Sequence, residues 1–287
     1  MTTSRTALVT GATQGLGLAL AAGLAARLEP SDRVLLTGRD AGRVEAAVAA
    51  LPARRARVEG RVLDVRDPAA ITDLAGDLGE VDVVLSNATS RMSPEQDPAE
   101  EVDAVVETNN LATSRVLRAF GPRLRPGGRL VVVASALGTL DKLDVRVRER
   151  FAAAARGSLE DVDALVADWR AAVHAGRAVE EGFGTWLNIP SKVAQVAAVR
   201  AVASARRAED LRAGRLVVAL CPGLIDTAAS RPWFADMSSA QTPDQAAAWP
   251  LDLVLGDEVA PFYGELVQFG RVLPWETGIP VPHRAVS

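Results

Sequence analysis

The sequence is poor in the residues that build several kinds of functional site. A single cysteine, Cys221, excludes a disulfide framework and a cysteine-based metal site. The two histidines, His174 and His283, lie far apart and stand in no metal-binding motif. We therefore expect no bound metal ion, and we expect both histidines to lie at the surface.

Strong charge and long apolar runs are also missing. The formal net charge is only -4, which gives no basic footprint for nucleic acid or for an anionic membrane surface. No apolar run reaches the roughly 18 residues of a membrane span, and the N-terminus does not resemble a signal sequence. The sequence thus predicts a cytoplasmic protein without a nucleic-acid or membrane partner.

The overall composition is that of an ordinary globular protein. The 287 residues are 48% hydrophobic and 24% charged, enough to bury one large core. Aromatic residues make up only 4%, and the one tyrosine, Tyr263, lies in a C-terminal segment. We expect a single domain that spans residues 1–287.

The N-terminal stretch predicts a strand, a glycine turn and a helix. Residues 7–9 form an apolar run typical of a buried parallel strand. Gly11, Gly15 and Gly17 follow, and residues 18–28 are rich in helix-forming alanine and leucine. Such a turn lets backbone N–H groups and a helix N-terminus approach a diphosphate, although an ordinary tight turn has the same glycines.

Further apolar runs predict the other strands of a parallel sheet, at residues 33–37, 56–65, 81–85, 129–135, 215–221 and, as the last strand, 262–275. Helices are expected at about 41–51 and 98–120, and from Pro190 onward. The alternation predicts an α/β doubly wound Rossmann fold of about seven parallel strands with helices on both faces.

Polar residues at strand ends suggest a ligand crevice. Arg39, after the second strand, favours the 2′-phosphate of NADP over NAD, unless it is simply a solvated loop arginine. Ser135 ends the fifth strand and points toward the crevice or merely starts a loop. Asn109 and Asn110 sit mid-helix, where asparagine is unfavourable, so they are either functional or a solvated pair.

These motifs, in this order, resemble the short-chain dehydrogenase/reductase family, and its carbonyl-reductase branch in particular. The resemblance implies an NADP(H) site formed by Gly11, Thr13, Gln14, Gly15, Leu16, Gly17, Arg39, Asp64, Val65, Asn87, Ala88, Lys192, Pro222, Gly223 and Thr227. It implies that Asp64 accepts from the adenine amino group, that Lys192 bonds the nicotinamide ribose, and that Thr227 touches the carboxamide.

The same resemblance implies a catalytic set of Asn109, Ser135, Asn188 and Lys192. In the family, the equivalent of Ser135 bonds the substrate carbonyl, that of Asn109 holds a relay water, and a tyrosine four residues before the lysine moves the proton. Asn188 stands at that tyrosine position, and an asparagine amide is no acid or base near neutral pH. Ser86 and Thr89, around Asn87, also depart from the family pattern.

Two segments are expected to shape the substrate site. Residues 140–185 form an insertion of helical character after the fifth strand. In the carbonyl-reductase branch such an insertion covers the pairing surface and leaves a monomer; a substrate lid or a partner surface is the alternative. Residues 228–249, with Trp233, Phe234 and Met237, form either a loop over the substrate or ordinary packing.

The functional expectation is an NADPH-dependent reductase of a carbonyl in a fairly large apolar small molecule, such as a secondary metabolite. Ser135 and Asn188 would position the oxygen, and water relayed through Asn109 and Lys192 would deliver the proton. Two alternatives remain. One is a redox-neutral cyclase, dehydratase or isomerase with structural NADP, and the other is a non-catalytic nucleotide-binding partner protein.

Overall fold

One twisted eight-stranded sheet organises the computed structural model, which describes residues 4–52 and 54–278. The strand order is β3-β2-β1-β4-β5-β6-β7-β8. Pairing is parallel from β3 through to β7, and β8 pairs antiparallel with β7. The strands are β1 Thr6–Val9, β2 Arg33–Gly38, β3 Arg57–Val62, β4 Val81–Ser86, β5 Leu124–Val133, β6 Leu216–Leu220, β7 Leu266–Gln268 and β8 Arg271–Leu273.

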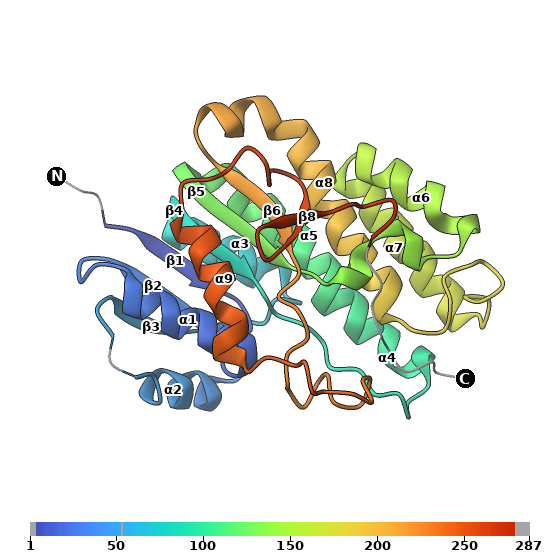
Figure 1. Ribbon diagram of the computed structural model, residues 1–287, viewed down its shortest axis with the longest axis horizontal. Helices are drawn as coiled ribbons and strands as arrows, with labels where there is room; N and C mark the ends of the chain where they lie inside the picture. Colours follow the sequence, from blue (N-terminus) through green and yellow to red (C-terminus); the bar gives the residue numbers. More distant parts are fainter. Residues whose placement is uncertain (1–3, 53, 279–287) are drawn as a thin grey trace.

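Helices cover both faces of this sheet, as the alternating pattern predicts. In Figure 1, α1 and α9 cross the near side, and α3, α5 and α8 lie behind. The helices are α1 Gly15–Arg27, α2 Ala41–Ala49, α3 Pro68–Leu78, α4 Pro98–Val105, α5 Ala112–Phe120, α6 Val145–Arg156, α7 Leu159–His174, α8 Asn188–Arg212 and α9 Pro243–Leu255. The doubly wound Rossmann fold is therefore confirmed.

The core lies between these layers. The central strands β1, β4 and β6 are fully buried or nearly so, because apolar side chains on both of their faces meet helices. In the part of the chain that the structure describes, no helix is both long and apolar enough to cross a bilayer.

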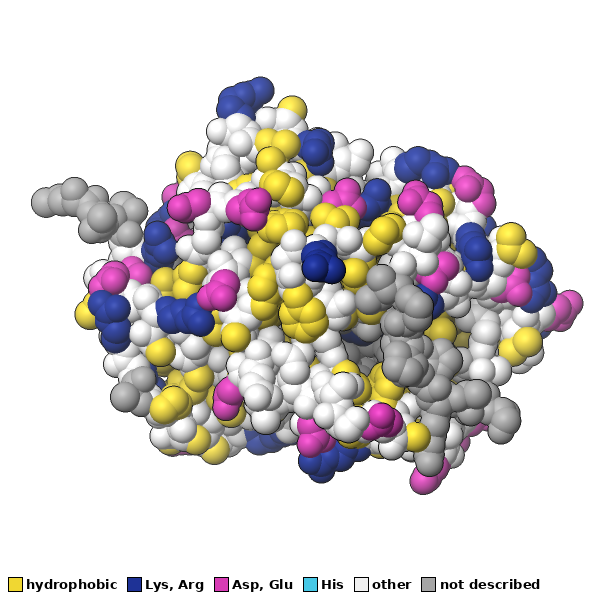
Figure 2. Space-filling model, in the orientation of Figure 1, with side chains coloured by type: hydrophobic (Ala, Val, Ile, Leu, Met, Phe, Trp, Pro, Cys, Tyr) yellow, Lys and Arg dark blue, Asp and Glu magenta, His cyan; other side chains and the backbone are white. Residues whose placement is uncertain are grey.

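The prediction of one last strand at 262–275 was wrong. This segment contains two short strands, β7 and β8, joined at Phe269 and Gly270, both of which have positive φ (47° and 75°). Such a turn reverses the chain within two residues and makes a hairpin. The hairpin leaves the side chains of Phe269 and Val272 exposed. Figure 2 shows apolar side chains near the middle of the face that is turned to the viewer in Figure 1.

The expected continuous helix at 98–120 is interrupted by a π-helix, η1, over Val106–Leu111. Here the backbone takes in an extra residue, an irregularity that is frequent at functional sites. Asn109 and Asn110 belong to this turn and are buried, at 0% and 4% exposure. They are therefore not a solvated pair.

The segment expected as an insertion holds α6 and α7 after two short 3-10 turns, η3 Ala136–Gly138 and η4 Leu140–Lys142. Ser158 and Asp161 form a capping box at the start of α7. The apolar face of α7 buries Trp169 almost completely. As Figure 1 shows, α6 and α7 lie beside α8, so they cover a flank of that helix.

Candidate active site

The glycine turn between β1 and α1 is built for close backbone approach. Gly11 and Gly15 have φ of +63° and +55°, a region that favours glycine. A Cβ on Gly11 would lie 2.7 Å from Cα of Ala88, and one on Gly17 would lie 2.3 Å from the carbonyl oxygen of Gly11. Any side chain at these positions would push the turn apart.

Hydrogen bonds from β4 fix the shape of this turn. Thr10 Oγ1 accepts from the backbone N–H groups of Asn87 (2.9 Å) and Ala88 (3.1 Å). In return, Asn87 Nδ2 donates to the carbonyl oxygens of Thr10 (3.1 Å) and Gly11 (3.2 Å). Asn87 and Ala88 therefore brace the turn together with Thr10, which precedes the glycines in the sequence.

The N-terminus of α1 opens at this turn without a side-chain cap. Its N-cap residue, Gln14, makes no capping hydrogen bond, and its first turn holds no acidic residue. By contrast, α2, α3, α4, α6, α7 and α9 all begin with a capping Asp, Ser or Thr. The free N–H groups and the helix dipole leave α1 suited to hold an anionic group.

Arginines gather where β2 and β3 end. Arg39 is exposed, while the neighbouring Asp40 is occupied in capping α2 through the N–H of Arg43. The Arg43 guanidinium donates to Gln14 Oε1 at 2.6 Å and so reaches the glycine turn. Hydrogen bonds from Arg66, with the charges of Arg66 and Arg39, hold the pKa of Asp64 below its usual value despite partial burial.

These contacts set the local charge. Asp64 is already paired with Arg66, so the end of β2 presents Arg39 and no free carboxylate from Asp40. Thr13 packs under Gly38, whose Cβ position is 2.5 Å from Thr13 Cγ2, and Leu16 and Val65 are buried. The arrangement is electropositive at its solvent edge, which suits a phosphate better than a bare hydroxyl.

Ser135 and Asn188 lie on the two elements that border the other end of the crevice. Ser135 follows β5 and caps η3, where its Oγ accepts from the N–H of Leu137 at 3.2 Å, which leaves its hydroxyl hydrogen to be donated elsewhere. Asn188 begins α8, and its side chain is half-buried with no hydrogen bond within the described residues. Four residues on, Lys192 lies on the same face of α8.

Lys192 and Asn109 are joined by a side chain that the sequence reading missed. Lys192 Nζ donates to Gln195 Oε1 at 2.8 Å and, more weakly, to the carbonyl oxygen of Val133 at 3.4 Å. Gln195 Nε2 donates to the carbonyl oxygen of Asn109 and to Thr113 Oγ1, both at 3.1 Å. The amide of Gln195 thus joins Lys192 to Asn109.

Burial dominates the electrostatics of Lys192. It lowers the pKa of this ammonium group to about 8, while the neighbouring Cys221 acts weakly in the opposite direction. Burial also raises the pKa of the Cys221 thiol, whose sulfur accepts a hydrogen bond from Gln268 Nε2 at 3.2 Å. Lys192 is thus the site's cation, and the thiol beside it stays neutral near pH 7.

Both polar atoms of the Asn109 side chain make hydrogen bonds. Its Oδ1 accepts from Thr89 Oγ1 (3.1 Å) and from the N–H of Ser90 (2.8 Å). Its Nδ2 donates to Ser191 Oγ at 3.2 Å. Thr89, where the chain departs from the family pattern, therefore helps to hold Asn109 in place.

The segment after β6 folds back over both halves of the crevice. A Cβ on Gly15 would lie 3.9 Å from Cγ2 of Thr227, which places Thr227 above the glycine turn. The rings of Trp186 and Trp233 stack, with centroids 5.2 Å apart. Gly223 follows Pro222 with φ of +87°. Trp186 lies two residues before Asn188 in the chain, so the two stacked indoles form an apolar wall close to the start of α8.

Tyr263, the one tyrosine in the sequence, lies away from Lys192. It is buried, and its hydroxyl donates to Asp210 Oδ2 at 2.7 Å. Asp210 lies eighteen residues beyond Lys192 on α8, a separation of roughly 27 Å along the helix. Burial and the neighbouring Asp210 carboxylate raise the pKa of Tyr263 further above its usual value.

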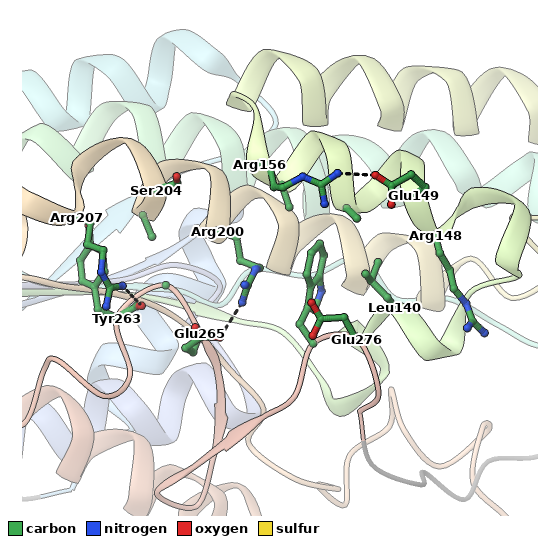
Figure 3. A pocket seen from close by; sticks show the side chains of 15 residues that line it. Leu140, Arg148, Glu149, Arg156, Arg200, Ser204, Arg207, Tyr263, Glu265 and Glu276 are labelled. Carbon is green, nitrogen blue, oxygen red and sulfur yellow. Dashed lines mark hydrogen bonds and ion pairs between the residues drawn. The ribbon is translucent and has the colours of Figure 1, made fainter.

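A cavity of about 850 Å³ lies away from this crevice, between α6, α8 and the segments that flank β7 and β8 (Figure 3). Its arginines are already engaged: Arg200 pairs with Glu265 at 2.7 Å and covers the Trp275 ring, and Arg156 pairs with Glu149. None of the predicted site residues lines it.

The histidines and possible metal ligands can be placed only in part. His174 is exposed and lies 3.0 Å from Asp103, and His283 lies outside the described residues. In residues 4–52 and 54–278, no group of three or more His, Cys, Asp or Glu side chains is arranged to hold a metal ion.

Comparison with known proteins decides the family. A model described as "short chain dehydrogenase" matches residues 5–167, more than half of the chain. This protein belongs to the short-chain dehydrogenase family. It is 30% identical to Carbonyl reductase [NADPH] 1 of Mus musculus, covering 96% of this chain and 100% of the relative. It is 31% identical to Carbonyl reductase [NADPH] 3 of Homo sapiens, covering 95% and 99%.

A solved structure shows the same fold. Salutaridine reductase from Papaver somniferum superimposes with a TM-score of 0.71 at 20% identity, covering 90% of this chain and 99% of its own. The chain thus shares the fold of this reductase, and it carries Asn188 and Gln195 close to Lys192 on α8. Gln195 had a sequence signal: it is the only polar side chain in the apolar run at 193–199.

Proposed function

We propose that this chain is an NADP(H)-dependent reductase that acts on a carbonyl of a fairly large apolar small molecule. The observation that carries the proposal is the uncapped α1 N-terminus at the glycine turn, with exposed Arg39 beside it. That pairing suits a diphosphate and a 2′-phosphate in one ligand. The names of the carbonyl reductase relatives support the same cofactor and reaction class.

In the proposed reaction the bound cofactor supplies the hydride. Ser135 donates its hydroxyl hydrogen to the substrate oxygen, and the unbonded amide of Asn188 donates a second hydrogen bond. Lys192 holds the cofactor ribose, while the stacked Trp186 and Trp233 give the substrate an apolar wall. Asn109 has a supporting role in this proposal: it holds α8 in position through its hydrogen bonds with Ser191 and Gln195.

We also propose that the protein works as a monomer and as one domain over residues 1–287. In its support, α6 and α7, within residues 140–185, pack along α8, and α7 also contacts α4. The flank of α8 that these helices cover is not free for a second copy of the chain. Size-exclusion chromatography with light scattering should return the mass of one chain.

One observation favours a second candidate, a redox-neutral reaction on the same scaffold with NADP bound as a structural element. Asn188 occupies the position of a proton-transferring phenol, and Gln195 joins Lys192 to Asn109. Neither amide ionises near neutral pH. A cyclase, dehydratase or isomerase that depends more on orienting its substrate than on delivering a proton could work with both amides.

Cofactor binding and turnover separate these candidates. NADPH fluorescence should change on binding, and the dissociation constant should rise about 10- to 100-fold in Arg39→Ala, since a hydrogen bond to a charged group is worth about 1.5–3 kcal/mol. Exposed Arg212, at the far end of α8, gives the control Arg212→Ala. NADH binding should be unchanged in both variants.

Loss of NADPH absorbance with a panel of ketones and quinones would support the reductase. Substrate turnover with no NADPH consumed would support the redox-neutral enzyme. If neither NADPH nor NADH binds, both proposals fall, and a partner protein without nucleotide binding becomes the better account.

A further inference from the structure

The polar chain around Lys192 is continuous and built entirely from protein atoms. It runs from Lys192 Nζ to Gln195 Oε1 at 2.8 Å and from Gln195 Nε2 to the Asn109 carbonyl oxygen at 3.1 Å. Thr113 Oγ1 closes it by donating to the same carbonyl oxygen at 2.6 Å. Gln195, Thr113 and Asn109 are at most 2% exposed.

An amide in this place has a definite chemical consequence. A water molecule between an ammonium group and a carbonyl oxygen can accept one proton and release another. An amide at neutral pH can only hold its two partners, because it neither gains nor loses a proton. The contacts of Gln195 therefore fix Lys192 in place and offer it no path for a proton toward Asn109.

Within residues 4–52 and 54–278, Lys192 also has no charged partner. Glu107 on η1 bonds Arg115, Asp163 on α7 bonds Arg118, and Asp141 on η4 pairs with Lys142. From β5 it meets the carbonyl of Val133, and from β6 the Cys221 thiol. Its charge is therefore balanced by dipoles alone, and chiefly by Gln195 Oε1.

We propose that Gln195 is a positioning residue that fixes Lys192 through its amide oxygen and thereby makes Lys192 itself the proton donor to the substrate oxygen. The inference rests on the proposed reductase function. Hydride passes from NADPH to the carbonyl carbon, the proton passes from Nζ of Lys192 to the oxygen, and the products are an alcohol, NADP⁺ and a neutral lysine. Solvent reprotonates the lysine when the alcohol leaves.

Only two lysines occur in the whole sequence, Lys142 and Lys192, so the titration of Lys192 can be followed directly. Protein labelled with ¹³C at the lysine ε carbon should give two signals, and Lys142→Arg assigns them. The Lys192 signal should titrate near pH 8, since burial lowers its pKa to about 8. This measurement needs no substrate and no cofactor.

Variants at position 195 then test the contact. Gln195→Leu removes the acceptor and should lower the pKa of Lys192 by about one further unit, whereas the isosteric Gln195→Glu should raise it by about one to three units. If the Lys192 signal titrates identically in all three proteins, Gln195 does not position Lys192 and the proposal is overturned. Gln195→Glu keeps the test decisive if the leucine variant does not fold.

The pH dependence of NADPH consumption tests the proton donor. Reduction should be fastest below the measured pKa of Lys192 and should fall about tenfold per pH unit above it, because the reactive ammonium is titrated away. In Gln195→Glu the fall should move to higher pH with the lysine signal. A rate that is flat through this range, or that does not move with the signal, contradicts the proposal.

The two proposals fail in different ways. If no ketone or quinone causes NADPH loss at any pH, the reductase function is wrong, and Lys192 as donor in that reaction is wrong with it. The response of the lysine signal to Gln195→Leu and Gln195→Glu would still establish or refute the positioning contact itself.

Discussion

Asn188 and Gln195 are the two amide residues that flank Lys192 on α8. Both lie on α8 within one turn of Lys192, and both present amides at places suited to groups that move protons. Asn188 could be singled out from the sequence, because the family resemblance implies a tyrosine at that position. The bridge through Gln195 could not, because a glutamine in an apolar helix does not reveal which buried groups it joins.

The simplest test at this scale restores the phenol. Asn188→Tyr should raise the rate of NADPH-dependent reduction of a simple ketone, because a positioned acid contributes about 10²–10⁴-fold. The gain is measured as kcat/KM from NADPH absorbance. Asn188→Phe is the matched control, which fills the same space without a hydroxyl and should give no gain. Equal rates in the two variants would place the reacting oxygen elsewhere.

The elements of the sheet were predictable to different degrees. The buried strands β1, β2, β4 and β6 appear in the sequence as short apolar runs, and the structure confirms them. The hairpin of β7 and β8 could not be recognised in the sequence, because strands of three residues are too short to show a hydrophobic pattern. The π-helix η1 was hidden for another reason: apolar spacing does not reveal one extra residue within a helix.

The glycine turn gives the prediction at the scale of an element. Gly17→Ala should abolish NADPH binding or weaken it more than 100-fold, because its Cβ would lie 2.3 Å from the Gly11 carbonyl oxygen and 2.5 Å from Asn87 Nδ2. The clash would displace the turn from the end of α1. Calorimetric or fluorescence titration measures the affinity.

Gly76 provides a control within another helix. It is exposed in α3, and nothing lies within 4 Å of its Cβ position. Gly76→Ala should therefore stabilise the fold by about 0.5–1 kcal/mol through helix propensity and leave NADPH affinity unchanged. If Gly17→Ala binds NADPH as well as Gly76→Ala does, the ligand does not occupy this turn.

At the scale of the whole molecule, the order of motifs was enough to predict the architecture. Parallel strands place their carboxyl ends together, which brings residues from β1, β4, β5 and β6 to one crevice. The groups that surround the Lys192 ammonium group could not be predicted from the sequence, because they depend on how α8 packs against the rest of the chain.

The burial of this ammonium group predicts how stability varies with pH. The pKa of Lys192 is lowered to about 8, so between pH 8 and 10.5 the unfolded chain binds more protons than the folded one. Burying the ammonium group therefore costs stability at pH 7, and the cost falls as pH rises through this window. Relative to Lys192→Met, the wild-type free energy of unfolding should rise by about 2.5 kcal/mol from pH 7 to pH 10.

Urea unfolding at several pH values measures this difference. Comparison with Lys192→Met removes the effects of groups that titrate in both proteins, including Tyr263. A difference that stays constant from pH 7 to pH 10 would mean that Lys192 titrates as an ordinary exposed lysine.

The placement of the two lysines also determines how readily this protein reacts with amine-directed reagents. The side chains of Lys142 and Lys192 are both largely shielded, with 14% of the first exposed and 9% of the second residue. Arginine supplies the other side-chain cations apart from histidine. Acylating dyes and amine-directed cross-linkers thus find no well-exposed lysine side chain on this protein.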